Sequence, residues 1–302
     1  MPPIVPYIRQ VEVLLGPVEE WRGNTGNTAQ QVRLYGDGGL DSLRIKFSVI
    51  KHLQSTASPT IIQVYNLSPG LRNSLLTPGI RVELSAGWGS HGLYPLFSGS
   101  VLAVSHQRAE ADVVTSMYCL AGWGATARAE VSLTFSGGTS VTDLVYVLAS
   151  SLPGVTIDEQ LIRIGERYTG PQGWSYWGAT AGGLDRLARE YGFTWWIDKG
   201  VFHAGEDGKP IASSGVVLSE DKGVLFRVEP MLALSGPEAP RQTSGISLQC
   251  LLNPWMDVGK AYALESKLNT NLNKTYYAHS VRHEGDTHSP QWATSVDSWE
   301  VM

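Results

Sequence analysis

The chain has 302 residues, of which 42% are hydrophobic and 17% charged, and its formal net charge is −5. This length allows two domains or three small ones. The negative charge and the lack of any lysine and arginine run argue against a nucleic-acid-binding module, which would carry a basic stripe. No apolar stretch reaches the ~20 residues of a membrane-spanning helix. The first ten residues lack a signal-peptide pattern, so we expect neither feature.

The first part of the chain predicts a run of strands. Three prolines within residues 1–7 indicate an extended arm, and residues 19–27 read as a polar loop. Ser68 is a suitable N-cap for a short helix that has Pro69 at its first position. Short apolar or alternating runs predict strands at Val11–Leu15, Gln31–Leu34, Leu43–Val49, Thr60–Tyr65, Ile80–Ala86, Leu96–His106 and Val113–Ala121.

The middle of the chain contains the two clearest helices. One begins after the capping-box-like Ser140 and ends near Ser151. The other covers Ala181–Tyr191, with apolar residues on one face and Gly192 as the stop. A hairpin, Phe193–Ala204, follows. Residues 137–210 therefore predict a small α+β insertion within a mainly β fold.

The last part of the chain predicts an antiparallel meander. Strands are expected at Ile246–Leu252, Ala261–Ser266, Tyr276–His283 and Gln291–Val301. The breaks between them are Asn253-Pro254, Gly259 and an acidic glycine turn at Glu284–Asp286. Residues 232–245 read as a loop rich in Gly, Pro and Ser.

Several segments together resemble bacteriophage tail hub proteins of the late-control D type, which are related to the hub part of type VI secretion spikes. The segments occur in the family's order and span most of the chain. They are Val64–Ser68 with the short helix after it, Gly79–Trp88, Leu96–Gly99, the helix pair with Tyr191–Trp195, and the Leu252–Pro254 meander.

The resemblance implies two tail-tube-like β-barrel domains separated by the α+β insertion. The expected division is 1–112 for the arm and first barrel, 113–136 plus 211–302 for the second barrel, and 137–210 for the insertion. Three such chains would present six barrels, which would match a six-fold tail tube to a three-fold spike. No fused spike or lysozyme-like segment is visible, so we expect the spike to be a separate protein.

Glycine-rich residues 87–92 fit the letters of a dinucleotide-binding motif, but no helix start follows them, and such a site needs one. Ser90-His91 invites a nucleophile reading, yet no nucleophile elbow surrounds it. We interpret the segment as a hairpin loop.

A second group of candidates is acidic or imidazole-bearing. His279 and His283 lie ~13 Å apart along a strand and cannot share an ion. A solvated hairpin tip is favoured over a metal site for the five residues His279, His283, Glu284, Asp286 and His288. The acidic pairs read as exposed loop charges, because nothing places any of them across a sugar; they are Glu19-Glu20, Asp158-Glu159 and Glu220-Asp221.

Two further pairs predict packing. Trp195-Trp196 lies in a strand, so one ring faces each side; core packing on both sides is favoured over a ligand contact. Cys119 and Cys250 lie in apolar strands and predict two buried, unreactive thiols in a protein made in a reducing compartment.

The resemblance implies a structural virion protein, a baseplate hub assembled in the host cytoplasm. The candidate residues weighed above predict a non-enzymatic protein with no catalytic, cofactor or metal residues. The expected hub is a homotrimer that associates through barrel edges. Its expected partners are the tail tube or a distal tail protein, the spike and the C-terminus of the tape-measure protein, with DNA crossing its lumen without specific binding. Ten Trp and twelve Tyr suit partner interfaces. They suit sugar binding as well, so a tail-associated cell-wall hydrolase and a β-sandwich receptor-binding protein remain alternatives.

Overall fold

The computed structural model describes residues 8–18, 32–39, 41–55, 59–75, 79–89, 91–221, 225–231 and 245–301. The predicted N-terminal arm, the polar loop 19–27 and residues 232–244 of the predicted Gly/Pro/Ser-rich loop lie outside the described residues, as do Glu19-Glu20 and Ser90.

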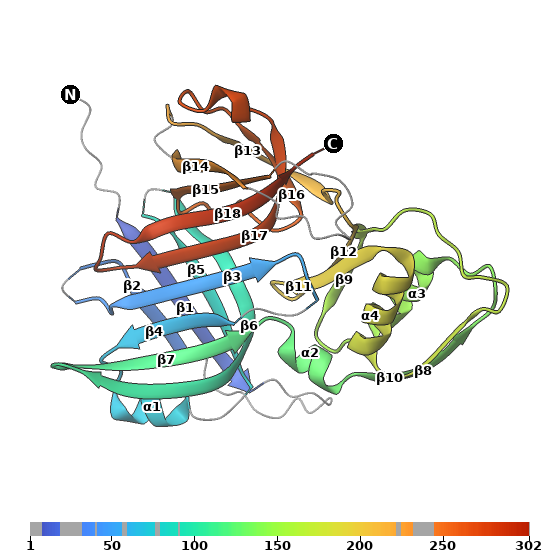
Figure 1. Ribbon diagram of the computed structural model, residues 1–302. Helices are drawn as coiled ribbons and strands as arrows, with labels where there is room; N and C mark the ends of the chain where they lie inside the picture. The colour runs from blue at the N-terminus through green and yellow to red at the C-terminus, as the bar shows by residue number, and fades with distance from the viewer. Residues whose placement is uncertain are drawn as a thin grey trace.

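Strands dominate the described chain (Figure 1), which confirms the prediction of a mainly β fold. The first part holds β1 (Arg9–Val18), β2 (Val32–Gly36), β3 (Ile45–His52), β4 (Thr60–Tyr65), β5 (Ile80–Trp88), β6 (Gly92–Ala109) and β7 (Asp112–Leu120). The last part holds β13 (Ala212–Leu218), β14 (Leu225–Met231), β15 (Gly245–Leu251), β16 (Lys260–Leu264), β17 (Thr275–Asp286) and β18 (Trp292–Glu300).

The predicted insertion is present as a mixed region. Its strands are β8 (Glu130–Phe135), β9 (Thr156–Arg163), β10 (Trp174–Ala179), β11 (Phe193–Asp198) and β12 (Val201–Glu206). The helices of the chain are α1 (Pro69–Ser74), α2 (Trp123–Arg128), α3 (Val141–Ser150), α4 (Thr180–Tyr191) and the short 3-10 helix η1 (Thr270–Leu272).

Of the three helix-capping residues predicted from the sequence, two cap their helices as expected. The Ser68 hydroxyl accepts a hydrogen bond from the Leu71 N–H, and Gly192 ends α4 in the left-handed conformation with φ 64°. Ser140 precedes α3 as expected, but its side chain caps nothing.

The strands of the first and last parts belong to one 13-stranded sheet rather than to two closed barrels, which corrects the barrel prediction. The path runs β14-β15-β18-β17-β3-β4-β7-β6-β5-β1-β2. Long β17 makes the join, because its first residues pair with β16 and its later ones, from Ser280 to Asp286, pair with β3. A ladder between segments from opposite ends of the chain leaves no trace in local sequence patterns.

Three hydrophobic cores fill the molecule. The first lies within the curled sheet of β1–β7 and includes Trp292 from β18. The second lies between α3, α4 and the strands of the insertion. The third lies within β13–β18 and receives Trp196 from the insertion. Strand β7 pairs with β4 and β6, so Met117 and Cys119 belong to the first core.

Candidate functional site

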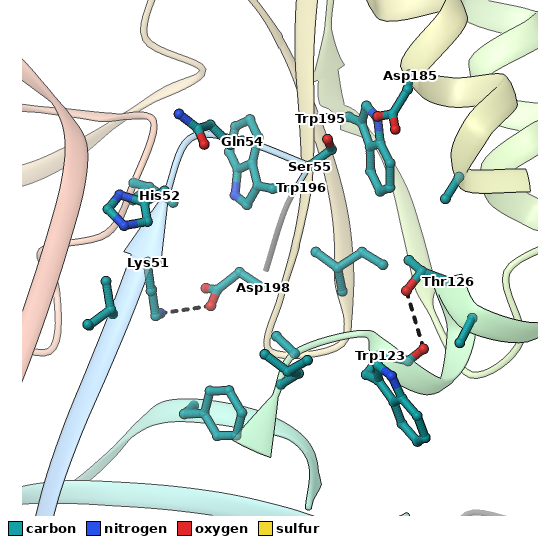
Figure 2. Close-up of a pocket in the computed structure, with 18 residues that line it drawn as sticks. Lys51, His52, Gln54, Ser55, Trp123, Thr126, Asp185, Trp195, Trp196 and Asp198 are labelled. Carbon is teal, nitrogen blue, oxygen red and sulfur yellow. Dashed lines mark hydrogen bonds and ion pairs between the residues drawn. The ribbon is translucent and has the colours of Figure 1, made fainter. Parts of the chain in front are cut away.

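A cleft of about 410 Å³ opens between the end of β3, helices α2 and α4, and strand β11 (Figure 2). Three indoles contribute to its walls: Trp123 from α2 and Trp195 and Trp196 from β11. The Trp195 indole N–H donates to Asp185 of α4 at 2.9 Å, which fixes both groups. Clefts between packed units are common places for partners and ligands to bind.

Two residues that line the cleft, Lys51 and Asp198, belong to a charge cluster, here called the charged joint, that also includes Lys199 and Asp257. The Lys51 ammonium lies 2.8 Å from an Asp198 oxygen and 2.8 Å from an Asp257 oxygen. Lys199 adds a contact of 2.8 Å to the other oxygen of Asp257. Figure 2 shows Lys51 on β3 and Asp198 on β11 pointing toward each other.

The charged joint brings together residues from all three regions. Lys51 ends the inward face of β3, Asp198 and Lys199 form the tip of the β11–β12 hairpin, and Asp257 follows β15. The side chains of Lys51 and Asp257 are each 8% exposed. Buried charges persist only when they are paired and hydrogen-bonded, so the three regions are held in one arrangement at this point.

The charges of the joint hold one another in the ionised state. Burial alone would lower the pKa of Lys51, but the Asp198 and Asp257 carboxylates raise it above its usual range. Burial alone would raise the pKa of Asp257, but the Lys51 and Lys199 charges and hydrogen bonds bring it well below its usual range.

The predicted solvated hairpin tip is wrong. His283 is 1% exposed, its Nδ1 lies 2.9 Å from the Thr294 hydroxyl, and burial lowers its pKa to about 3. Asp286 is 2% exposed and accepts two hydrogen bonds from the Arg44 guanidinium, at 2.8 and 3.2 Å. Glu284, Gly285 and Asp286 continue β17 instead of forming a turn, because they pair with Ser48, Phe47 and Lys46 of β3.

The structure does not gather the five metal candidates into one site. His279 faces the Trp299 ring at 6.2 Å, while His283 is enclosed beside Thr294 and His288 contacts Thr287. Within the described ranges, no three His, Cys, Asp or Glu residues are arranged to hold a metal ion. The absence of metal, cofactor and catalytic residues stays a prediction.

The glycine-rich segment forms the hairpin between β5 and β6. Trp88 pairs with Gly92, and the His91 N–H donates to the Trp88 carbonyl at 2.7 Å. A strand follows it, so the helix that a phosphate site requires is not there.

The two described acidic pairs have separate surroundings. Asp158 and Glu159 are exposed on β9, which corrects their assignment to a loop. The Ser266 hydroxyl donates a hydrogen bond to Glu220, which stabilises the turn at Ser266. Asp221 forms an ion pair with Lys267.

Both tryptophans of the pair are core residues, but of different cores. Trp195 packs in the second core at 2% exposure, and Trp196 packs in the third at 4%. Cys119 and Cys250 are buried free thiols, and burial raises the pKa of each to about 12.

The chain is mainly β, with a small mixed insertion that is joined to the large sheet at the charged joint. The model of the family described as baseplate hub gp41 matches residues 32–296. The chain therefore belongs to the baseplate hub gp41 family, as a structural component of a phage tail.

Solved structures share this fold at low sequence identity. A tail protein from Neisseria meningitidis is 11% identical, with a TM-score of 0.63 and coverage of 97% of both chains. A 43 kDa prophage MuSo2 tail protein from Shewanella oneidensis is 9% identical, with a TM-score of 0.59 and coverage of 96% of both chains. No curated protein matches the sequence significantly.

A third similar structure is the E. coli c3393 protein, described as a component of the type VI secretion system that resembles the T4 tail proteins gp27 and gp5. It is 10% identical, with a TM-score of 0.56, and the match covers 86% of this chain and 73% of that one. Among the described residues, no helix is long and apolar enough to cross a membrane.

Proposed function

We propose that the protein forms a trimeric ring in the baseplate that joins the tail tube to the central spike and lines the channel for DNA. The observation that carries this proposal is the family match over residues 32–296. The further partners are a distal tail protein and the C-terminus of the tape-measure protein, and assembly takes place in the host cytoplasm.

The broad antiparallel run β14-β15-β18-β17-β3-β4-β7-β6 supports a role as a channel wall. Its strands alternate between buried positions that face the cores and accessible positions that face away. The accessible face extends across both halves of the chain, because the ladders from β14 to β6 are continuous. A single curved surface of this kind suits the inside of a ring.

The charges on this face are balanced. Lys46 and Arg282 lie on neighbouring strands, and Glu284 and Asp297 lie close to them in the same ladders. Small or amide side chains fill the positions between, as at Ser48, Gln63, Gln249 and Ser295. A wall with no excess of cations would let DNA pass, since phosphates are retained mainly by Lys and Arg.

We propose a domain division that is based on the three cores. It has a first sheet unit over residues 8–121, an insertion over 122–210 and a second sheet unit over 211–301. This division moves β7 from the second unit to the first, because β7 pairs with β4 and β6.

The test is the mass and the image of the purified protein. The proposal predicts a particle of three copies with a central hole, which binds tail-tube protein on one side and spike protein on the other. Rings that bind neither protein would contradict the joining role. Rings that retain double-stranded DNA at physiological salt would contradict the passive channel.

A further inference from the structure

The cleft between β3, α2, α4 and β11 continues into a second hollow, which extends along α4 to Arg189. The residues that line both are Gln54, Ser55, Asp185 and Trp195. Figure 2 shows the cleft side of this boundary, with the Asp185 carboxylate beside the Trp195 ring. The two hollows therefore form one groove between the end of β3 and the insertion. A groove that continues in this way suits a segment of polypeptide, whereas small molecules bind in compact pockets.

Apolar side chains make up most of the cleft wall. Besides the three indoles, they include Ile50, Phe97, Leu120, Ile197 and Val258. Lys51 is the one Lys or Arg among the described residues that line the cleft, and its ammonium already contacts Asp198 and Asp257, each at 2.8 Å. The described part of the cleft therefore has no Lys or Arg free to hold an anionic ligand such as a phosphate.

Asp185 is a carboxylate of this groove that has no cation partner among the described residues. It is half-buried on α4, and its Oδ1 accepts a hydrogen bond from the Trp195 indole N–H at 2.9 Å, which fixes its position. Arg189 lies one turn further along α4, but its Nε donates to the backbone carbonyl of Asp185, at 3.3 Å. The groove thus presents a fixed negative charge in mainly apolar surroundings.

We propose that the groove binds a segment of another tail protein, with a Lys or Arg side chain of that segment in the cleft beside Asp185. Such a side chain has an apolar stem and a charged head, which match the apolar wall and the carboxylate. The indoles of the wall add attraction for the cation. A neutral occupant would leave the Asp185 charge unpaired, so charge complementarity selects the cation.

The second hollow does not suit the same cation, because Arg189 lines it and would repel a second positive charge. The basic side chain therefore lies on the cleft side of Trp195, and the rest of the segment crosses Gln54 and Ser55 into the hollow. The proposal rests on the proposed function for its setting, since a tail places other proteins beside this chain. It adds the chemistry of one partner and the place where that partner binds.

A binding titration on the purified protein tests the charge preference of the cleft. The probes are n-butylguanidinium, which has the head of an arginine side chain, and n-butylurea, which is neutral and of similar shape. Tryptophan fluorescence reports binding, because three indoles line the cleft. The wild-type protein is expected to bind the guanidinium about tenfold more tightly than the urea, or more.

Asp185→Asn should abolish this preference, because the amide oxygen still accepts the Trp195 hydrogen bond while the charge is lost. Its unfolding midpoint in urea should stay that of the wild type. Asp143→Asn is the matched control, since Asp143 is exposed on α3 and lines neither hollow, and it should keep the full preference. Equal binding of the two probes by the wild-type protein, or an unchanged preference in Asp185→Asn, overturns the inference.

Photocross-linking in assembled tails identifies the occupant. With p-benzoylphenylalanine in place of Ala127, an exposed residue of α2 that lines the cleft, irradiation should capture one segment of another tail protein that contains a Lys or Arg. Adding Asp185→Asn should lower the yield about tenfold. The inference is overturned by no capture, by capture of a segment without Lys or Arg, or by capture of a second copy of this chain, and the hub role then stands. Tails that assemble without this protein overturn the proposed function itself.

Discussion

Lys51 is the residue whose ion pairs join the three regions of the chain. It occupies the next inward position of β3 after Ile45, Phe47 and Val49, so the pattern that buries those three side chains buries an ammonium as well. Asp198 and Asp257 compensate for that burial from two other regions of the chain. A residue that looks like the end of a strand in the sequence thus holds the insertion and both sheet halves together.

Replacing Lys51 with Met should destabilise the protein by about 3–5 kcal/mol, because two buried carboxylates would lose their shared cation. The free energy of unfolding in urea, followed by tryptophan fluorescence, measures the loss. Lys267→Met is the matched control: its partner Asp221 is 62% exposed, so the change should be within about 1 kcal/mol. Equal effects of the two variants would mean that the joint does not hold the regions together.

His283 should make the fold sensitive to mild acid. Its pKa is about 3 in the folded chain and about 6.5 in the unfolded one, so the unfolded chain takes up the proton first as pH falls. The stability is complete above pH 6.5 and declines toward pH 3, by roughly 4–5 kcal/mol in all. Chemical unfolding at several pH values measures this slope. His283→Asn should flatten it, and an unchanged slope in that variant would assign the acid sensitivity to other groups.

The thiols of Cys119 and Cys250 should be inert in the folded protein. Burial raises the pKa of each to about 12, so the reactive thiolate is scarce at neutral pH. A thiol reagent added without denaturant is expected to label neither cysteine within minutes and both in urea. Prompt labelling of the native protein would show that one of these strands opens readily.

Among the secondary structure elements, the β11–β12 hairpin contributes side chains to two different hydrophobic cores. Its strand β11 supplies Trp195 to the second core and Trp196 to the third, on opposite faces of the same strand. The Trp196 ring also stacks on His203 of β12, with 5.2 Å between centroids. The hairpin therefore belongs to the insertion by sequence and to the second sheet half by packing.

Trp196→Ala should destabilise the protein by about 3–5 kcal/mol, the usual cost of removing a large aromatic side chain from a core. Trp177→Ala is the matched control, because Trp177 lies on β10 and is 84% exposed. That control should change the free energy of unfolding by no more than about 0.5 kcal/mol. If both variants unfold at the same urea concentration, the third core does not depend on the insertion.

Local patterns predicted most elements and few of the contacts between them. Thr60–Tyr65 and the helix ending at Gly192 follow from alternation and capping, which act within a few residues. Strands β9 and β10 were missed because their polar and apolar residues do not alternate regularly, whereas β8 was missed although its polar and apolar residues do alternate. The hairpin tip at Glu284–Asp286 was predicted wrongly, since a glycine in a strand and a glycine in a turn look alike. Here Gly285 is needed because a side chain would meet the Phe47 ring.

The candidate site was the least predictable part of the molecule. Asp257 lies 206 residues from Lys51, and no local pattern in the sequence marks Asp257 as buried. The alternation of inward-facing residues along β3 was the one sequence pattern that indicated an inward-facing Lys51. The tryptophan pair was predicted as packing on both sides, and the structure adds that the two sides belong to different cores.

At the scale of the whole molecule, one curved sheet runs through both halves of the chain, and the insertion is fixed to it at the charged joint. The continuous sheet joins the two halves directly, and in the proposed ring they would form one segment of the wall. Three such segments, joined edge to edge, would form the ring that we propose for a hub.

The mass of the purified protein in solution, measured by light scattering together with electron microscopy, tests this account most directly. The account predicts a particle of three 32.8 kDa chains with a central hole at micromolar concentration. A wild-type protein that stays monomeric at high concentration, or that forms two-fold dimers without a hole, would contradict it.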